Sequence, residues 1–200
     1  MTGSDLSTRQ RRHALHRKIE SLVPSAWIQR FAALVPAGAR VLDVAAGQGR
    51  HARFFAERGA RVLAVDIDAD ALASLAGVPG VATRVADLEG DPWPFANAAF
   101  DAIVVANYLH RAALPHLLES LTPHGALLYE TFAAGNEAYG RPSNPAFLLR
   151  EGELLECVRD RLSIVAFEQG RIGHERVAVV QRIAAVGRAR AWPPSLPAPG

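Results

Sequence analysis

Hydrophobic residues recur along the chain in two spacings, and the alternation of these spacings predicts an α/β sheet. Short apolar runs, which are typical of buried strands, lie at residues 40–44, 61–66, 82–86, 100–106, 126–131, 163–168 and 175–184. Segments that favour helix lie at residues 49–58, 68–75, 115–121 and 151–159. Strands and helices that alternate in this way form doubly wound sheets.

The connection between the last two predicted strands is the short segment QGRIGH, residues 169–174. A crossover between parallel strands needs about a dozen residues or more, so these two strands should pair antiparallel. The sequence therefore predicts a single doubly wound, mostly parallel, seven-stranded sheet with a Rossmann-like fold and an antiparallel final hairpin.

Helices are also expected before the sheet, within residues 8–36. Leu15, Ile19 and Leu22 lie on one helical face at i, i+4 and i+7 spacing. Pro24 is expected in the first turn of a second short helix, where its missing N–H costs nothing. These N-terminal helices should cover part of the sheet.

The composition fits one globular domain. The chain has 200 residues, of which 50% are hydrophobic, which is enough for one full core. We assign this domain to residues 8–187. Residues 1–7 are small and polar and are expected to be disordered, and the proline-rich residues 188–200 to form a loose tail.

Charge and cysteine content exclude several function classes. The net charge of +2 does not require a nucleic-acid partner, although basic residues gather near both ends of the chain. The one cysteine, Cys157, leaves no intrachain disulfide or cysteine-based metal site, and we expect no metal. No apolar run approaches the roughly 20 residues that span a bilayer. We therefore expect a cytoplasmic protein that is a monomer or a homodimer.

The turn after the first strand, in VLDVAAGQGR, combines a carboxylate with glycines. Asp43 lies near the strand end, and Gly47 and Gly49 follow in the turn. Glycines let a ligand approach the backbone, and the segment from Gly47 to Ala52 matches the G-x-G-x-x-G/A dinucleotide fingerprint. However, Asp43 would repel a pyrophosphate and suits a cationic group. A nicotinamide-dependent oxidoreductase stays open as an alternative.

Further polar residues follow the other strands at the same sheet edge. Asp66 ends the second strand and can accept hydrogen bonds from ribose hydroxyls. Asn107, Tyr108 and His110 lie just past the fourth strand, and Glu130 ends the fifth. Carboxyl ends of parallel strands share one edge, so we expect these side chains to lie close together.

The turn after the first strand resembles the first motif of class I S-adenosylmethionine-dependent methyltransferases, which is D/E-x-G-x-G-x-G. Ala45 stands in place of the first glycine. The stretch WPFANAAFDAIVVANYLH and the segment LTPHGALLYE, with His124 in place of a glycine before the fifth strand, are also similar to that family. The segments GRHARFFAERG and ETFAAGNEAYGRPSNPAFLLREGELLE resemble small bacterial methyltransferases of the tellurite-resistance type. The resemblance covers about residues 38–185.

This resemblance implies the methyltransferase version of the Rossmann-like fold and S-adenosylmethionine as cofactor. The cofactor-binding residues would then be Asp43, Ala45, Gly47, Gly49, Asp66, Ile67, Asp87, Leu88 and Asn107. His110 is the candidate base and Glu130 a second catalytic candidate, with a salt bridge to Arg141 as an alternative role for Glu130. Arg50 and His51 are expected to be surface residues, and contact with the cofactor carboxylate or a substrate anion is their alternative role.

The acceptor is expected to be a small molecule. Tyr108, Tyr139 and Arg141 are the candidate substrate-binding residues, the last two in the long loop 132–149, which is expected to be a lid or a substrate contact. Besides the oxidoreductase, a non-catalytic cofactor-binding scaffold remains an alternative, since Ala45 departs from the family motif.

Overall fold

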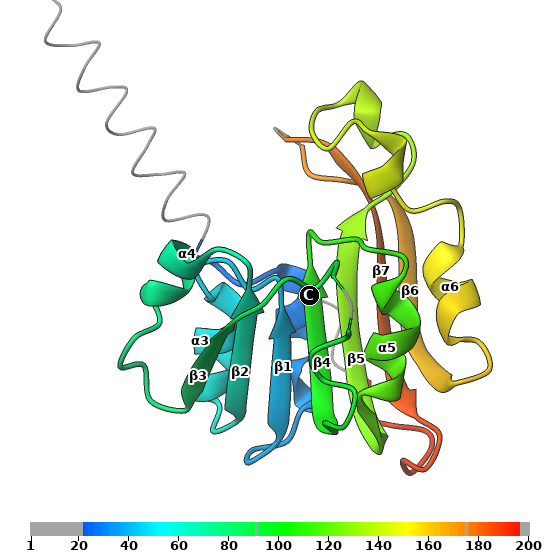
Figure 1. The fold of residues 1–200 in the computed structure, drawn as a ribbon. Helices are drawn as coiled ribbons and strands as arrows, with labels where there is room; N and C mark the ends of the chain where they lie inside the picture. Colours follow the sequence, from blue (N-terminus) through cyan, green and yellow to red (C-terminus); the bar gives the residue numbers. More distant parts are fainter. Residues whose placement is uncertain (1–21, 91, 175, 197–200) are drawn as a thin grey trace, which may run out of the picture.

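The computed structural model describes residues 22–90, 92–174 and 176–196. Its centre is a seven-stranded sheet with strand order β3-β2-β1-β4-β5-β7-β6 (Figure 1). The strands are β1 (Arg40–Val44), β2 (Arg61–Asp66), β3 (Val81–Val85), β4 (Phe100–Ala106), β5 (Leu121–Phe132), β6 (Leu162–Ile172) and β7 (Ala178–Gly187). The predicted disordered segment 1–7, nearly all of the first predicted helix and the end of the tail lie outside the described residues.

Pairing in the sheet is parallel from β3 to β5 and antiparallel for β7, which lies between β5 and β6. The seven strands and the antiparallel final hairpin confirm the predicted fold class. The chain leaves β1 toward β2 on one side, whereas β4 lies on the other side of β1. Ligands of open α/β sheets bind at such a point of reversed strand order, beyond the carboxyl ends of the strands.

Helices cover both faces of the sheet. The helices α2 (Ala26–Arg30), α3 (Arg50–Glu57) and α4 (Ala69–Ala73) pack against one face, and α5 (Ala113–Glu119) and α6 (Glu153–Val158) against the other. Neighbouring strand residues alternate between these two layers. Val41 belongs to the first core and Leu42 to the second, and both are fully buried.

Two local predictions are wrong. Pro24 lies before the second helix and not in its first turn, because the side chain of Ser25 caps α2 by accepting a hydrogen bond from the Trp27 amide. The segment expected as a turn before the fifth strand is extended, so β5 begins at Leu121. Leu121 pairs with Phe100 of β4, and this pairing extends the strand.

The predicted loop 132–149 is present beyond the carboxyl end of β5, with short 3₁₀ turns η2 (Asn136–Ala138) and η3 (Pro145–Phe147). A bridge between Ala133 and Leu149 closes its base. In Figure 1 the loop rises at the top of the view, above β5 and β7. Among the described residues, no helix is long and apolar enough to cross a membrane.

Candidate functional site

The turn between β1 and α3 follows the strand at the point of reversed order. Ala45, Gly47 and Gly49 all have left-handed backbone conformations, with φ of 51°, 54° and 75°. Such a conformation costs a residue with a Cβ about 1 kcal/mol, so Ala45 carries strain that glycine would not. Strained residues of this kind gather at functional sites.

The two glycines of the turn, Gly47 and Gly49, differ in the space around them. A Cβ at Gly49 would lie 2.4 Å from Leu75 Cδ1, so a side chain there would force Leu75, in the turn after α4, to move. A Cβ at Gly47 would meet no described atom within 4 Å. The backbone of the turn is therefore open on the side of Gly47.

Asp43 is a buried carboxylate below this turn. It is 1% exposed, and the Ala52 amide of α3 donates a hydrogen bond to it. Its Oδ2 has no hydrogen-bond partner within the part of the chain that the structure describes. Burial raises the pKa of Asp43 to about 7. An unpartnered buried carboxylate oxygen fits a cationic ligand group, which would both donate to it and favour its ionised form.

Asp66 connects the end of β2 to the same turn. Its Oδ2 accepts a hydrogen bond from the Gly47 amide at 2.7 Å, and its Oδ1 accepts one from the Asp68 amide at 2.9 Å. A carboxylate has about four acceptor positions, so Asp66 keeps capacity for two further donors. The next side chain, Ile67, is 68% exposed and forms an apolar surface beside it.

The connection after β3 brings a third acidic segment to this edge. Asp87 is exposed, and its Oδ1 accepts a hydrogen bond from the Glu89 amide at 2.8 Å. Leu88 is 6% exposed and packs in the core. The Glu89 Oε2 lies 3.9 Å from His110 Nδ1, so this connection reaches the segment after β4.

The segment after β4 is held in a strained conformation by β5. Asn107 has a φ of 58°, and its amide donates to the Glu130 carbonyl at 2.9 Å. The buried Tyr129 hydroxyl donates to the Tyr108 carbonyl at 2.8 Å. Ala45 and Asn107 are the two non-glycine residues with positive φ among those the structure describes, and they follow adjacent strands.

The hydroxyl of Tyr108 is buried, and it has no hydrogen-bond partner among the described residues. Burial, followed by the nearby charges of Glu89, Asp87 and Asp66, raises the pKa of Tyr108 to about 12. This hydroxyl therefore remains a hydrogen-bond donor near three carboxylates.

Glu130 and His51 do not lie as the sequence predicts. Glu130 pairs with Arg182 at 3.2 Å and not with Arg141, and it also accepts a hydrogen bond from Ser25 Oγ at 2.7 Å. His51 is 3% exposed, and its Nε2 accepts the Ser25 amide at 3.2 Å. Burial, and secondly the Arg50 charge, lowers the pKa of His51 to about 3 and keeps it neutral.

Sequence reasoning missed Ser25 and Arg182 as neighbours of the site. An arginine within the apolar run of β7 is a signal for an inward carboxylate partner, but by its place near the C-terminus Arg182 is only one of several basic residues. The segment that carries Ser25 links the start of α3 with the end of β5. It thus borders the same edge of the sheet as the turn.

Tyr139 and Arg141 come together at a separate cavity of about 570 Å³ beyond the carboxyl end of β5. Its walls come from the loop 132–149 and from the start of β7. They consist of Phe132, Asn136, Tyr139, Gly140, Arg141, Arg176, Val177 and Ala178. The side chains predicted to bind substrate thus share one cavity, apart from Tyr108.

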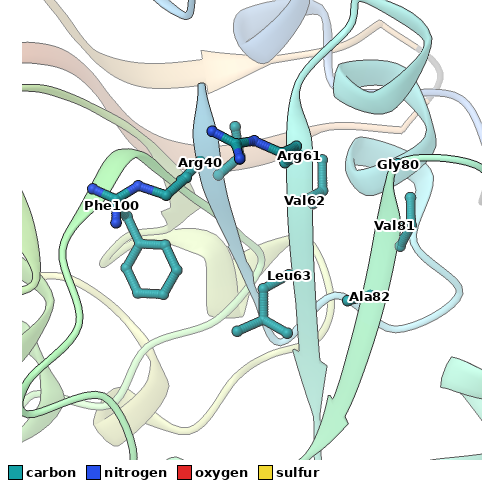
Figure 2. A pocket seen from close by; sticks show the side chains of 9 residues that line it. Arg40, Arg61, Val62, Leu63, Gly80, Val81, Ala82 and Phe100 are labelled. Atoms are coloured by element: carbon teal, nitrogen blue, oxygen red, sulfur yellow. The ribbon is translucent and has the colours of Figure 1, made fainter. Parts of the chain in front are cut away.

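A further cavity lies at the opposite edge of the sheet. Figure 2 shows it between Arg40, Arg61, Leu63 and Phe100, where β1, β2 and β4 begin. None of the predicted site residues lines it. The polar groups described above gather instead at the carboxyl edge.

The sequence and the fold of the chain also resemble those of known proteins. A family model of the methyltransferase domain matches residues 41–125, which run from β1 into β5. A search of curated protein sequences found no match.

Several solved structures share the fold. The chain is similar to TehB from Haemophilus influenzae with a TM-score of 0.68, 18% identity and coverage of 83% of this chain, and it spans 63% of that protein. A TehB-like S-adenosylmethionine-dependent methyltransferase from Corynebacterium glutamicum has a TM-score of 0.60 and 19% identity, over 91% of this chain and 99% of that one.

A third similar structure is 1,6-didemethyltoxoflavin-N1-methyltransferase from Burkholderia thailandensis, with bound 1,6-didemethyltoxoflavin and S-adenosylhomocysteine. Its TM-score is 0.61 and its identity 23%, over 92% of this chain and 86% of that one. The family match and the shared fold favour the methyltransferase interpretation over the nicotinamide alternative. Residues 41–125 thus match a methyltransferase domain, and most of the chain shares the fold of these solved structures.

Proposed function

We propose that this protein is a methyltransferase, which binds S-adenosylmethionine at the turn 45–49 and methylates a small molecule held beside the loop 132–149. The observation that carries the cofactor site is Asp43, whose buried Oδ2 has no partner among the described residues, below an open glycine turn. The α-ammonium and sulfonium of S-adenosylmethionine provide the positive charge that such a carboxylate needs.

The other cofactor contacts follow from the same edge. Asp66 has acceptor capacity for the two ribose hydroxyls, and the exposed side chain of Ile67 offers an apolar surface to the adenine ring. Asp87 would face the adenine amino group. Leu88 would support the adenine ring from the core, and Asn107 would border the methionine portion of the cofactor.

S-adenosylmethionine supplies an activated methyl group, so the protein mainly orients the two reactants. An acceptor that carries a proton at its nucleophile needs a base, and we assign this role to His110. The carboxylate of Glu89, 3.9 Å from His110 Nδ1, would stabilise the imidazolium. Tyr108 supplies a hydroxyl donor. Glu130 orients Ser25 and Arg182 and is in our proposal a positioning residue.

The cavity that contains Tyr139 and Arg141 supports a small acceptor. Its volume of about 570 Å³ matches ligand pockets for small molecules. Its arginines and Tyr139 favour an aromatic or anionic group. The toxoflavin methyltransferase, whose fold this chain shares, also binds a small-molecule substrate.

Calorimetry tests the cofactor part of the proposal. The protein should bind S-adenosylhomocysteine and S-adenosylmethionine, and not NAD(H). Binding of NAD(H) with no binding of S-adenosylhomocysteine would contradict it. Transfer of labelled methyl groups to a panel of small molecules, RNA and protein tests the acceptor class. Tight cofactor binding without transfer to any of them would favour the non-catalytic scaffold.

We also propose a cytoplasmic location, because the one cysteine fits a reducing compartment. A monomer or a homodimer is the expected assembly. Cell fractionation and light scattering of the purified protein test these two expectations.

A further inference from the structure

Arg111 follows His110 directly and contacts two other parts of the chain. Its Nη1 donates to the Ala146 carbonyl at 2.7 Å, and its Nη2 donates to the Leu148 carbonyl at 2.7 Å. The same guanidinium is bidentate to Glu153, with Nε–Oε1 of 2.7 Å and Nη2–Oε2 of 2.9 Å. One side chain thereby joins the segment after β4, the end of the loop 132–149 and the first turn of α6.

Glu153, which binds this arginine, is itself held in place by other contacts. Its side chain is 5% exposed, and its Oε2 also accepts the Arg150 amide at 2.7 Å. Although burial alone would raise it, the hydrogen bonds from Arg111 and Arg150 hold the pKa of Glu153 below its usual value. The next residue is held as well, since the Leu154 amide donates to the fully buried Gln181 of β7 at 3.1 Å.

The loop that Arg111 holds forms one wall of the acceptor cavity. Hydrogen bonds between Ala134 N and Leu149 O, and between Leu149 N and Phe132 O, close the base of the loop. Tyr139 and Arg141 of the cavity lie within it. In Figure 1 this loop projects beyond β5, away from the β1–β2 side of the sheet where the glycine turn lies.

The part of the segment after β4 that borders the proposed cofactor site is held by other hydrogen bonds. The Asn107 amide bonds to Glu130 O, and the Tyr108 carbonyl accepts the Tyr129 hydroxyl. Neither bond involves Arg111. Loss of Arg111 should therefore release the acceptor loop and leave the cofactor side in place.

We infer that Arg111 is a positioning residue, which fixes the acceptor loop against the segment that carries His110. This inference rests on the proposed function, since it assigns the acceptor to the cavity at this loop. Arg111 acts through the carbonyls of Ala146 and Leu148 and not by contact with substrate. It sets the distance between the acceptor and the methyl donor.

The test compares three variants of the full-length protein in the presence of S-adenosylhomocysteine. Arg111→Met removes all four hydrogen bonds. The double variant Arg111→Met/Glu153→Gln also removes the buried negative charge, and its amide oxygen can still accept the Arg150 amide. The control, Arg161→Met, removes an exposed ion pair with Glu119, which lies where α5 ends and β6 begins, at the sheet edge opposite the loop.

Hydrogen exchange of the amides of residues 133–149 should become about tenfold faster in both Arg111 variants, as expected from one or two lost hydrogen bonds. Exchange of the Asn107 amide and the affinity for S-adenosylhomocysteine should stay as in the wild type. With any acceptor that the wild type methylates, KM should rise about tenfold while kcat changes much less. The control should match the wild type throughout.

The double variant separates positioning from charge compensation. If Arg111 serves only to neutralise Glu153, the double variant will recover wild-type exchange, KM and thermal stability together, and this result would overturn the inference. Recovery of thermal stability with fast loop exchange supports it. A wild type that does not bind S-adenosylhomocysteine would instead contradict the proposed function, and the exchange measurement without ligand would still decide the role of Arg111.

Discussion

The Gly47 amide donates a hydrogen bond of 2.7 Å to the Asp66 carboxylate, so the end of β2 holds the turn that follows β1. The same carboxylate therefore shapes the cofactor site and, in our proposal, binds the ribose. Removing the Asp66 carboxylate should therefore weaken cofactor binding both because the turn loses its support and because the ribose loses its acceptor.

Asp66→Ala should weaken the binding of S-adenosylhomocysteine by roughly 1–3 kcal/mol, because charge-assisted hydrogen bonds are lost. Isothermal titration calorimetry measures this change. Asp101→Ala is the matched control, since Asp101 is a carboxylate at the opposite sheet edge, where it accepts the Arg40 amide at 2.9 Å. Equal affinity of Asp66→Ala and the wild type would mean that the ribose lies elsewhere.

Alanine substitution should mainly lower stability at Gly49 and mainly weaken cofactor binding at Gly47. Gly49→Ala should lower the free energy of unfolding by about 2–4 kcal/mol, because its Cβ clashes with Leu75 in a left-handed conformation. Gly47→Ala should cost only about 1 kcal/mol of stability. Its Cβ, however, enters the open space in front of the turn and should weaken cofactor binding. Urea unfolding and calorimetry measure the two quantities, and unchanged binding by Gly47→Ala would place the cofactor away from the turn.

The pKa of Asp43 predicts a pH-dependent stability. The unfolded chain releases this proton near the ordinary pKa of 3.8, whereas the folded protein keeps it until about pH 7. The free energy of unfolding should therefore fall as the pH rises between these values, by the contribution of Asp43. Asp43→Asn removes this contribution. The variant should therefore gain stability relative to the wild type as the pH rises from about 4 to about 7, and above pH 7 the difference between the two proteins should stay constant.

The shifted pKa of His51 changes the free energy of unfolding with pH in the opposite direction. Its folded pKa of about 3 lies below the ordinary 6.5, so its contribution to stability is lost as the pH falls from about 6.5. This contribution is common to the wild type and Asp43→Asn, and it cancels in their difference. A difference between the two proteins that does not change with pH would contradict the assignment for Asp43.

His110→Ala should lower kcat more than it changes the affinity for S-adenosylhomocysteine, since a base acts in the chemical step. Stopped-time transfer of labelled methyl groups measures kcat, and calorimetry the affinity. His116→Ala is a suitable control, because His116 lies on α5 and stacks on Trp93 away from the carboxyl edge. A normal rate in His110→Ala would remove His110 as the base.

Much of the fold could be predicted because it depends on local pattern. The apolar run at β4, Phe100–Ala106, has the predicted bounds, and so do β1 and β2. The start of β5 could not be predicted in this way. Thr122 and Pro123 have the composition of a turn, but pairing with β4 from Leu121 onward decides their conformation.

The site was predictable where a residue follows a strand, and much less so where its partner is distant in sequence. Asp43 and Asp66 lie at the ends of their strands and Asn107 directly follows β4, and all three lie at the expected edge. The place of His51 at the start of a helix predicts a solvent-facing side chain, but its partner is Ser25, 26 residues earlier. The partners of Arg111 lie 35 to 42 residues later, so no local pattern indicates its role.

A crystal structure of the protein with S-adenosylhomocysteine tests the central claim most directly. The account predicts the ligand along the turn 45–49, with its ammonium group at hydrogen-bond distance from Asp43 Oδ2 and its ribose on Asp66. A structure in which the ligand binds at another edge of the sheet, or leaves Asp43 Oδ2 without a ligand contact, would contradict it.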